Sequence, residues 1–190
     1  MGKTGICIAL CLSLLCACSG GQKEDALQTA MDFRAALLNA ASYSFKAEVT
    51  ADYGERVYEF SMDCVCSGGT TNITVTKPDT ISGITAQVTN ASGEVTFDGT
   101  ALDFGTLADG NIVPLAVPAV AADSWTSAYI ASAGKEKDAL RVHYERGYDD
   151  AQLLVDTWFS LKNNLPIYAE VCYNDSCILQ MRLSDFQEVA

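Results

Sequence analysis

The cysteines are the side chains in this 190-residue sequence whose spacing most directly suggests chemistry. Leu15-Cys16-Ala17-Cys18 places an aliphatic residue three positions before Cys18, with small residues between them. This is the pattern of a bacterial lipobox. There the thiol of the last cysteine forms a thioether with a diacylglyceryl group, whose acyl chains are of the palmitate type, before the preceding segment is cut away. The pattern predicts that Cys18 is lipidated.

The residues on either side of this motif are those of an exported lipoprotein. The apolar run 6–17 has about a dozen residues, the length of a signal-peptide core and short of the roughly 20 that span a bilayer. Residues 1–17 are therefore expected to be a cleavable lipoprotein signal peptide, and residues 18–25 a lipidated flexible tether. Such a protein is anchored by lipid at the extracytoplasmic face of the bacterial cell membrane. The alternative is an ordinary signal peptide that happens to be rich in cysteine.

Four cysteines remain after this segment: Cys64, Cys66, Cys172 and Cys177. An even number in an exported domain suggests disulfides, and four cysteines allow three pairings. In Cys172-Tyr-Asn-Asp-Ser-Cys177 the Asn-Asp pair suits the tip of a hairpin, which makes Tyr173 and Ser176 the closing pair and the two cysteines the next, non-hydrogen-bonded pair. A Cys172–Cys177 disulfide is expected. Cys64 and Cys66 have no assigned partner, and a four-cysteine zinc site is a weaker alternative because its spacings match structural zinc motifs poorly.

Other reactive side chains do not form a recognisable catalytic motif. The only histidine, His143, alternates with Val142 and Tyr144 and so falls on the polar side of a predicted strand. No serine or cysteine nucleophile motif accompanies it, and Asp149-Asp150 after Gly147 is typical of a turn. We therefore expect a protein that is not an enzyme and has no cofactor or resident metal. An enzyme would need His143 to meet a carboxylate from another strand.

The net charge of the chain restricts the kinds of partner that it could bind through electrostatic attraction. Removal of residues 1–17 takes away Lys3 and leaves 11 basic against 24 acidic residues, a formal charge of −13. A domain with this excess of acid is a poor candidate for binding nucleic acid or anionic lipid headgroups through charge, because both present negative surfaces.

Hydrophobic periodicity predicts the elements that position these side chains. One amphipathic helix is expected over about 24–40, with apolar residues at helical spacing at Leu27, Met31, Ala35 and Leu38 and, beside them, Ala30, Phe33 and Leu37. One or two short helices are expected over 118–130, with Gly134 as a natural helix stop. Period-two alternation predicts short strands near 43–50, 57–66, 73–76, 84–88, 95–97, 102–104, 140–144, 153–159, 167–171 and 178–183. Turns about every ten residues make this an antiparallel meander.

In this order the elements resemble the LolA/LolB-like lipoprotein-carrier superfamily, over about residues 26–189. Three segments bear the resemblance. Tyr43-Ser-Phe-Lys-Ala-Glu-Val-Thr50 is similar to the family's opening strand, Gly93-Glu-Val-Thr-Phe-Asp-Gly-Thr100 to its turn with the pattern f-d-G, and Val155-Asp-Thr-Trp-Phe-Ser-Leu-Lys-Asn-Asn-Leu-Pro-Ile167 to a recurrent strand–turn–strand. In the last segment Lys162-Asn-Asn replaces the usual glycine-containing turn.

The resemblance implies an α+β fold in which a strongly curved antiparallel sheet, a half-barrel, wraps around helices over residues 26–190. It also implies an apolar concave face that takes an acyl chain, a lipid or a lipoprotein. The residues expected to line this cavity are Phe45, Tyr58, Phe60, Met62, Ile73, Val75, Phe97 and Phe104. The alternative is that these side chains only pack against the helices.

Two functions follow from the resemblance. The first is a membrane-anchored lipoprotein that binds a hydrophobic ligand in the half-barrel. The second is an interaction lipoprotein that docks a cell-envelope or spore-germination enzyme and has no ligand of its own. Relatives in Gram-positive envelopes are themselves lipoproteins, and some are partners of cell-wall enzymes. The lipobox departs from the soluble carriers of the family, because a tethered protein cannot shuttle freely between membranes. Seven extended residues, Ser19 to Asp25, reach on the order of 25 Å.

Overall fold

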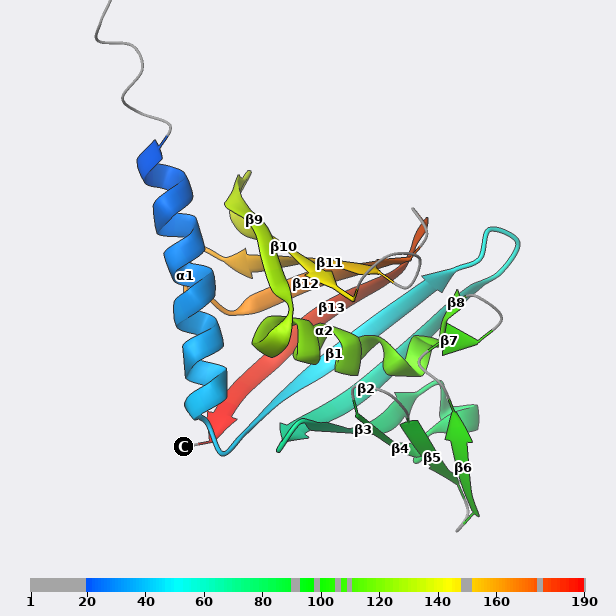
Figure 1. The fold of residues 1–190 in the computed structure, drawn as a ribbon. Coiled ribbons are helices and arrows are strands. Elements are labelled where there is room, and N and C mark those ends of the chain that lie inside the picture. The colour runs from blue at the N-terminus through cyan, green and yellow to red at the C-terminus, as the bar shows by residue number, and fades with distance from the viewer. Residues whose placement is uncertain are drawn as a thin grey trace, which may run out of the picture.

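The computed structural model describes residues 20–89, 93–97, 100–104, 107–108, 111–147, 152–173 and 176–189. One antiparallel sheet of eleven strands, in the order β6-β5-β4-β3-β2-β1-β13-β12-β11-β10-β9, curves around two helices (Figure 1). A separate ribbon pairs β7 (Leu107–Ala108) with β8 (Asn111–Ile112). The predicted fold class, an α+β half-barrel with a curved antiparallel sheet, is confirmed.

The sheet is a meander of two halves. Strands β1 to β6 pair in chain order, strands β9 to β13 do the same, and β1 pairs with β13 to join the halves. The strands of the sheet are β1 (Ser42–Asp52), β2 (Val57–Ser67), β3 (Thr70–Lys77), β4 (Thr85–Val88), β5 (Gly93–Phe97), β6 (Thr100–Phe104), β9 (Tyr129–Glu136), β10 (Ala139–Arg146), β11 (Leu153–Ser160), β12 (Pro166–Tyr173) and β13 (Ser176–Val189). A short 3-10 turn, η1 (Asp79–Ile81), separates β3 from β4.

Strand β1 illustrates how the sequence produces a one-sided sheet. Its alternate residues Tyr43, Phe45, Ala47, Val49 and Ala51 are buried, whereas Lys46 and Glu48 on the other face are exposed. The buried residues of β13 lie directly opposite, with Met181 across from Val49. Because side chains alternate along a strand, this register gives the sheet a continuous apolar concave face and a polar outer face.

Helix α1 (Gly20–Asn39) packs along one side of the sheet, beside β9. Two features differ from the expectation. The helix begins at Gly20, so residues 20–25 are helical where a flexible tether was expected. Its buried side consists of Ala26, Ala30, Phe33 and Leu37, whereas Leu27, Met31 and Leu38 remain exposed. Two adjacent apolar stripes occur on this helix, and the side with the alanines packs inward because small side chains allow a close approach.

Helix α2 (Val117–Ser127), which follows the 3-10 turn η2 (Pro114–Ala116), crosses the concave face of the sheet (Figure 1). The helical segment expected over 118–130 ends earlier in the structure. Tyr129 and Ile130 begin strand β9, which runs through Gly134 and pairs with β10. Pairing with β10 satisfies the backbone of this segment, and that partner was not visible in the local sequence pattern. Among the described residues, no helix combines the length and apolar character needed to cross a membrane.

Candidate ligand-binding pocket

The centre of the concave face is filled by protein side chains. Trp125 of α2 is fully buried there, and its indole Nε1 donates a hydrogen bond to Oγ1 of Thr157 at 3.0 Å. Phe33 of α1, Phe45 of β1 and Phe186 of β13 surround its ring, with ring centroids 5.9, 5.5 and 6.2 Å away. These rings join both helices to the sheet, so the middle of the half-barrel is core.

The eight residues expected to line a cavity separate into groups. Phe45, Met62, Ile73 and Val75 are buried on the concave face. Phe60 is half-buried against the core, and Tyr58 is 41% exposed near the tip of the β1–β2 hairpin, with its ring centroid 6.0 Å from that of Tyr53. The strands of Phe97 and Phe104 are described, but their side chains lie outside the described residues. Cavity lining by these eight residues remains a prediction.

A pocket of about 430 Å³ lies at one end of the concave face, and we call it the end pocket. It is bounded by the C-terminal end of α1, by α2 and by the β2–β3 hairpin. Its lining residues are Leu37, Leu38, Ala40, Ala41, Ser42, Tyr43, Cys66, Ser67, Gly68, Gly69, Thr70, Thr71, Val88, Thr89, Ala119, Ala122, Asp123 and Thr126. This volume is within the range of small-molecule sites. None of the six predicted residues whose side chains are described lines it.

Small residues account for the space. Ala40 and Ala41 link α1 to β1, Ala119 and Ala122 face the pocket from α2, and Gly68-Gly69 form the hairpin turn. Both glycines have positive φ, 56° and 77°, which a side chain adopts only with strain. The turn therefore carries no side chain that would close this end of the half-barrel.

The floor of the end pocket is polar but uncharged. The Tyr43 hydroxyl lies 3.5 Å from the carbonyl oxygen of Ala122, and Cys66 Sγ lies 3.5 Å from Thr71 Oγ1. Burial raises the pKa of the Tyr43 phenol well above its usual value and also raises the pKa of the Cys66 thiol. Both groups are therefore neutral near pH 7. Asp123, the charged residue in the lining, forms an ion pair with Arg146. Such a surface suits an apolar or weakly polar ligand.

The four cysteines after residue 18 separate into two places. Cys172 and Cys177 form the expected disulfide across β12 and β13, with 1.99 Å between the sulfurs, and Tyr173 pairs with Ser176 as predicted. Cys64 and Cys66 are free and buried on β2, so the alternative of a four-cysteine zinc site is wrong. Among the described residues, no group of three or more His, Cys, Asp or Glu side chains is placed to hold a metal ion.

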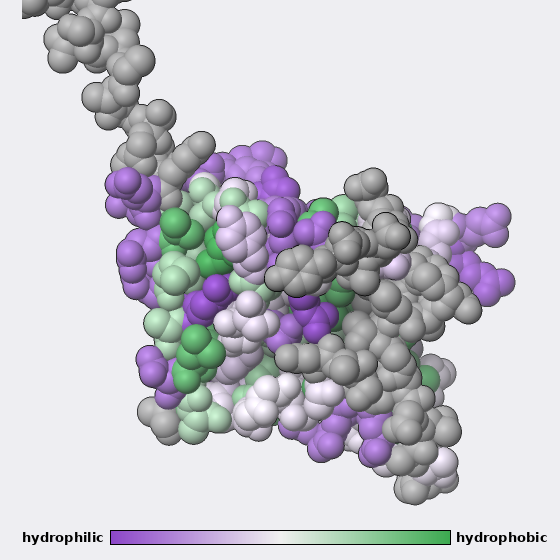
Figure 2. Space-filling view, in the orientation of Figure 1, coloured by the Kyte–Doolittle hydropathy of each residue, from purple (hydrophilic) through white to green (hydrophobic). Residues whose placement is uncertain are grey.

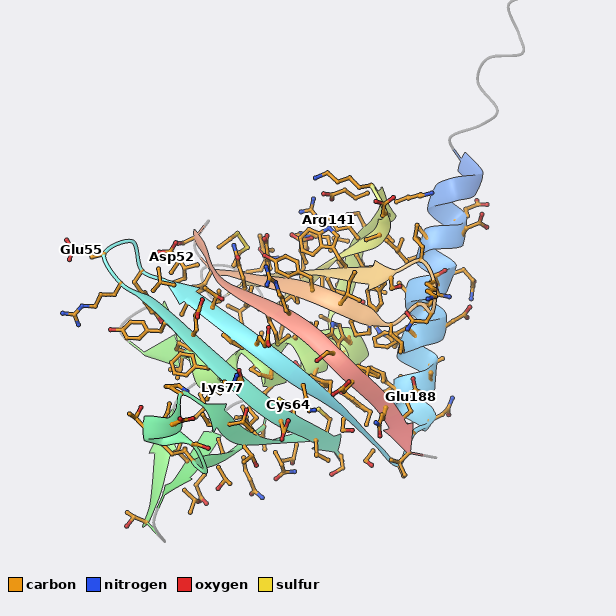
Figure 3. The ribbon with its side chains drawn as sticks, turned by 180° about the vertical axis from the view of Figure 1, so that it is seen from behind. Asp52, Glu55, Cys64, Lys77, Arg141 and Glu188 are labelled. Atoms are coloured by element: carbon orange, nitrogen blue, oxygen red, sulfur yellow. A yellow bond between two sulfur atoms is a disulfide. The ribbon has the colours of Figure 1, made fainter. Side chains whose placement is uncertain are left out.

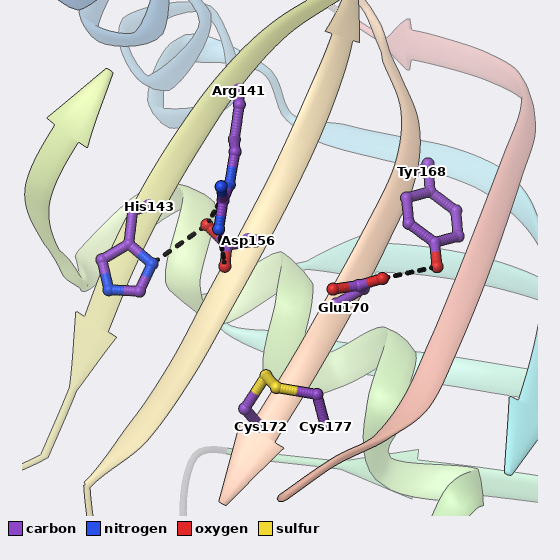
Figure 4. Close-up of a disulfide and its surroundings, with 7 residues drawn as sticks. All are labelled: Arg141, His143, Asp156, Tyr168, Glu170, Cys172 and Cys177. Atoms are coloured by element: carbon purple, nitrogen blue, oxygen red, sulfur yellow. Dashed lines mark hydrogen bonds and ion pairs between the residues drawn. A yellow bond between two sulfur atoms is a disulfide. The ribbon is translucent and has the colours of Figure 1, made fainter. Parts of the chain in front are cut away.

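His143 is not isolated on the surface. Its Nδ1 lies 3.0 Å from Oδ1 of Asp156 on β11, and Arg141 donates from Nε and Nη2 to the two oxygens of the same carboxylate at 2.9 and 2.8 Å (Figure 4). The Arg141 guanidinium also stacks over Trp158, 5.2 Å from the ring centroid. Burial alone would raise the pKa of Asp156, but hydrogen bonds from Arg141 and His143 lower it below its usual value. The sequence pattern did not identify Asp156, because its position beside His143 depends on the β10–β11 register.

This network stabilises the outer face of the sheet. We expect Asp156→Asn to lower the free energy of unfolding by about 1–3 kcal/mol at neutral pH, because it removes a nearly buried carboxylate that accepts charged hydrogen bonds. The folded-state pKa of Asp156 is depressed, so its contribution is present above the unfolded pKa and disappears as pH falls through the folded value. Urea unfolding at pH 7 and at about pH 3 measures this. If wild type and Asp156→Asn differ in unfolding free energy by the same amount at both pH values, Asp156 does not stabilise the fold as a carboxylate.

A second hollow, of about 1,010 Å³, has a different character. Its lining is mostly polar and charged, with Phe60 as the member of the predicted set, and consists of Glu48, Val49, Thr50, Glu59, Phe60, Ser61, Lys77, Pro78, Asp79, Tyr168, Gln180, Met181 and Arg182. Glu48, Glu59 and Arg182 lie on the outer face of the sheet, away from α2. The end pocket is the better candidate for a hydrophobic ligand because it opens from the concave face and contains one neutralised charge.

Comparison with known proteins gives structural neighbours only. No protein-family model and no curated protein matches the chain. Among solved structures, it is similar to a LolA superfamily protein from Nitrosomonas europaea, with 12% identity, 87% of this chain and 93% of that chain covered, and a TM-score of 0.46. It is also similar to lipoprotein LppX from Mycobacterium tuberculosis (10% identity, 87% and 95% covered, TM-score 0.41) and to LprF from Mycobacterium bovis (16%, 87% and 94%, 0.38).

Proposed function

We propose that this chain is a membrane-anchored extracytoplasmic lipoprotein that binds a hydrophobic ligand, an acyl chain or lipid, in the end pocket. The observation that carries the proposal is a pocket of about 430 Å³ whose floor is formed by neutral Tyr43, Cys66 and Thr71. Leu37 and Val88 add apolar walls. The proposed ligand site is at one end of the half-barrel, because Trp125 and its aromatic neighbours occupy the centre of the concave face.

Among the described residues that line the pocket, none is a buried ion that a hydrocarbon chain would leave without a partner. Its charged residue, Asp123, accepts hydrogen bonds from Arg146 and from the Ser127 hydroxyl. The hydroxyls of Ser42, Thr70 and Thr126 also line the pocket and can bond to a polar group on the ligand. A chain with one polar end therefore fits the chemistry better than a compact charged ligand.

A tryptophan placed in the pocket tests the proposal. Thr126 of α2 lines the end pocket, whereas the next residue, Ser127, is exposed and does not. We expect Thr126→Trp to reduce the lipid that co-purifies with the protein by about tenfold or more, because the indole occupies the ligand volume. We expect Ser127→Trp to retain the lipid, because Arg146 still neutralises Asp123 when the Ser127 hydroxyl is lost. Extraction of the washed protein followed by lipid mass spectrometry gives the ratio of lipid to protein.

Two results would contradict the proposal. One is wild-type protein that carries no stoichiometric lipid and shows no saturable binding of a fluorescent fatty acid. The other is a Thr126→Trp protein that folds normally by circular dichroism and binds as much lipid as the Ser127→Trp control.

A further inference from the structure

Helix α1 has an apolar stripe that the fold leaves uncovered. Leu27, Met31 and Leu38 are 44%, 46% and 63% exposed. Their spacing of four and seven residues places them on one side of the helix, and we call them the α1 stripe. Figure 2 shows hydrophobic residues exposed along this helix. The stripe is separate from the buried side of α1, which contains Ala26, Ala30, Phe33 and Leu37.

Between Leu27 and Leu38, the charged residues of α1 that the structure describes leave this stripe open. Arg34 lies beside it, but its guanidinium is tied to the end of α2 by hydrogen bonds to the carbonyl oxygens of Trp125 at 2.8 Å and Ala128 at 2.6 Å. Asp25 and Asp32 lie roughly 100° or more away around the helix, and Glu24 flanks the stripe in the first turns. The exposed side chains between Leu27 and Leu38 therefore form a narrow apolar band and not a mixed charged face.

The α1 stripe lies between the predicted lipidation site and the end pocket. The helix begins at Gly20, two residues after Cys18, the predicted lipidation site. At the other end, Leu38 lines the end pocket. At 1.5 Å per residue, Gly20 and Leu38 are separated by about 27 Å along the helix axis. The stripe thus begins about 10 Å along the helix from Gly20 and ends at the mouth of the proposed ligand site.

We propose that α1 lies along the bilayer surface, with the α1 stripe in the interfacial region and the end pocket opening onto the membrane. This inference rests on the proposed function and on lipidation of Cys18, which fixes the first turn of α1 beside the bilayer. An upright helix would leave the stripe in water and hold the pocket about 27 Å away from the surface. A helix lying flat buries Leu27, Met31 and Leu38 together, as interfacial amphipathic helices do.

This orientation defines the ligand class and its route. An acyl chain of a membrane lipid that leaves the bilayer beside Leu38 meets Leu37 and Ala41 next, within the same pocket lining. It reaches Tyr43 and Cys66 without crossing the polar outer face of the sheet. The ligand is therefore a lipid of the membrane to which the protein is anchored, and the attraction is apolar, since the domain carries an excess of negative charge.

Depth-dependent fluorescence quenching on the full lipidated chain tests the orientation. Tryptophan is introduced by Leu27→Trp, Leu38→Trp or Val57→Trp, and each protein is reconstituted in phosphatidylcholine vesicles with or without brominated acyl chains. Val57 is the matched control because it is 56% exposed and lies beside the β1–β2 hairpin tip, at the side of the sheet away from α1; Asp52 and Glu55 mark this tip in Figure 3. We expect bromine to quench most of the added fluorescence of the Leu27 and Leu38 variants and none of that of the Val57 variant.

Three outcomes overturn the proposal. Quenching at position 27 without quenching at 38 means that the helix stands upright. Equal quenching at all three positions means that the surface contact is not specific to α1. Absence of quenching at 27 and 38, with these positions crosslinking between copies, means that a second copy covers the stripe. Each result is independent of the Thr126→Trp lipid measurement, and the mass of the lipidated chain verifies the anchor separately.

Discussion

Replacing Trp125 by alanine is expected to lower the free energy of unfolding by about 3–5 kcal/mol, among the largest effects of any single core substitution here. Trp125 is fully buried at the point where α2 meets the sheet, with Phe33, Phe45 and Phe186 around its ring. Alanine leaves a cavity that rigid aromatic neighbours fill poorly. It also removes the hydrogen-bond partner of the buried Thr157 hydroxyl, which adds a desolvation cost.

Urea unfolding followed by far-ultraviolet circular dichroism measures this loss. Trp158→Ala is the matched control, because Trp158 lies on the outer face of the sheet, where it is only half-buried and contacts Arg141 and Tyr168. Trp125→Phe separates packing from the hydrogen bond and should fall between alanine and wild type. A Trp125→Ala protein as stable as the Trp158→Ala control would mean that α2 does not pack into the concave face.

The strands were the part of the fold that the sequence predicted best. Apolar and polar residues alternate strictly along residues 43–51. A strand with one solvent-exposed face is the regular element that produces this pattern. Strand β9 was missed because its side chains do not alternate cleanly between buried and exposed. Its backbone pairs with β10, so only the tertiary partner distinguishes Tyr129 and Ile130 from a continuation of the helix.

The site was less accessible to sequence reasoning than the fold. Apolar strand residues such as Met62 and Ile73 were correctly placed on one face, but periodicity does not say whether that face encloses a ligand or a helix. Here α2 takes the space. The end pocket depends instead on small residues, Ala41, Gly68 and Ala122, from three distant segments. An alanine or glycine leaves no pattern that distinguishes a pocket wall from a close packing contact.

Helix α1 and Asp156 illustrate the same difficulty in two ways. On α1, two apolar stripes lie side by side, and the sequence alone did not determine that Ala30 packs inward while Met31 stays exposed. Asp156 reaches His143 only through the register of two strands, which pairs these residues directly. No motif near Asp156 in the sequence indicates that its carboxylate is the partner of His143.

Cys18→Ser is expected to remove the lipid anchor of the protein almost completely. The hydroxyl of serine does not accept the diacylglyceryl group that the cysteine thiol takes as a thioether, so both acyl chains are lost. One acyl chain gives only marginal, reversible membrane binding, whereas two give a stable anchor. The apolar stripe of Leu27, Met31 and Leu38 is too narrow to replace them. We therefore expect a change from nearly all lipid-bearing protein to protein without lipid, which is either soluble or retains residues 1–17 and stays at the membrane through them.

Cys16→Ser is the matched control for this prediction. It replaces the same residue type two positions earlier with another small residue, so the motif Leu15-Ser-Ala-Cys18 remains a lipobox. Detergent phase partition and incorporation of labelled palmitate, carried out in a bacterial host, distinguish the two variants. Palmitate should label the wild-type chain and the Cys16→Ser chain but not the Cys18→Ser chain. Equal labelling of all three would show that another residue carries the lipid, and the position of the anchor relative to α1 would then have to be assigned anew.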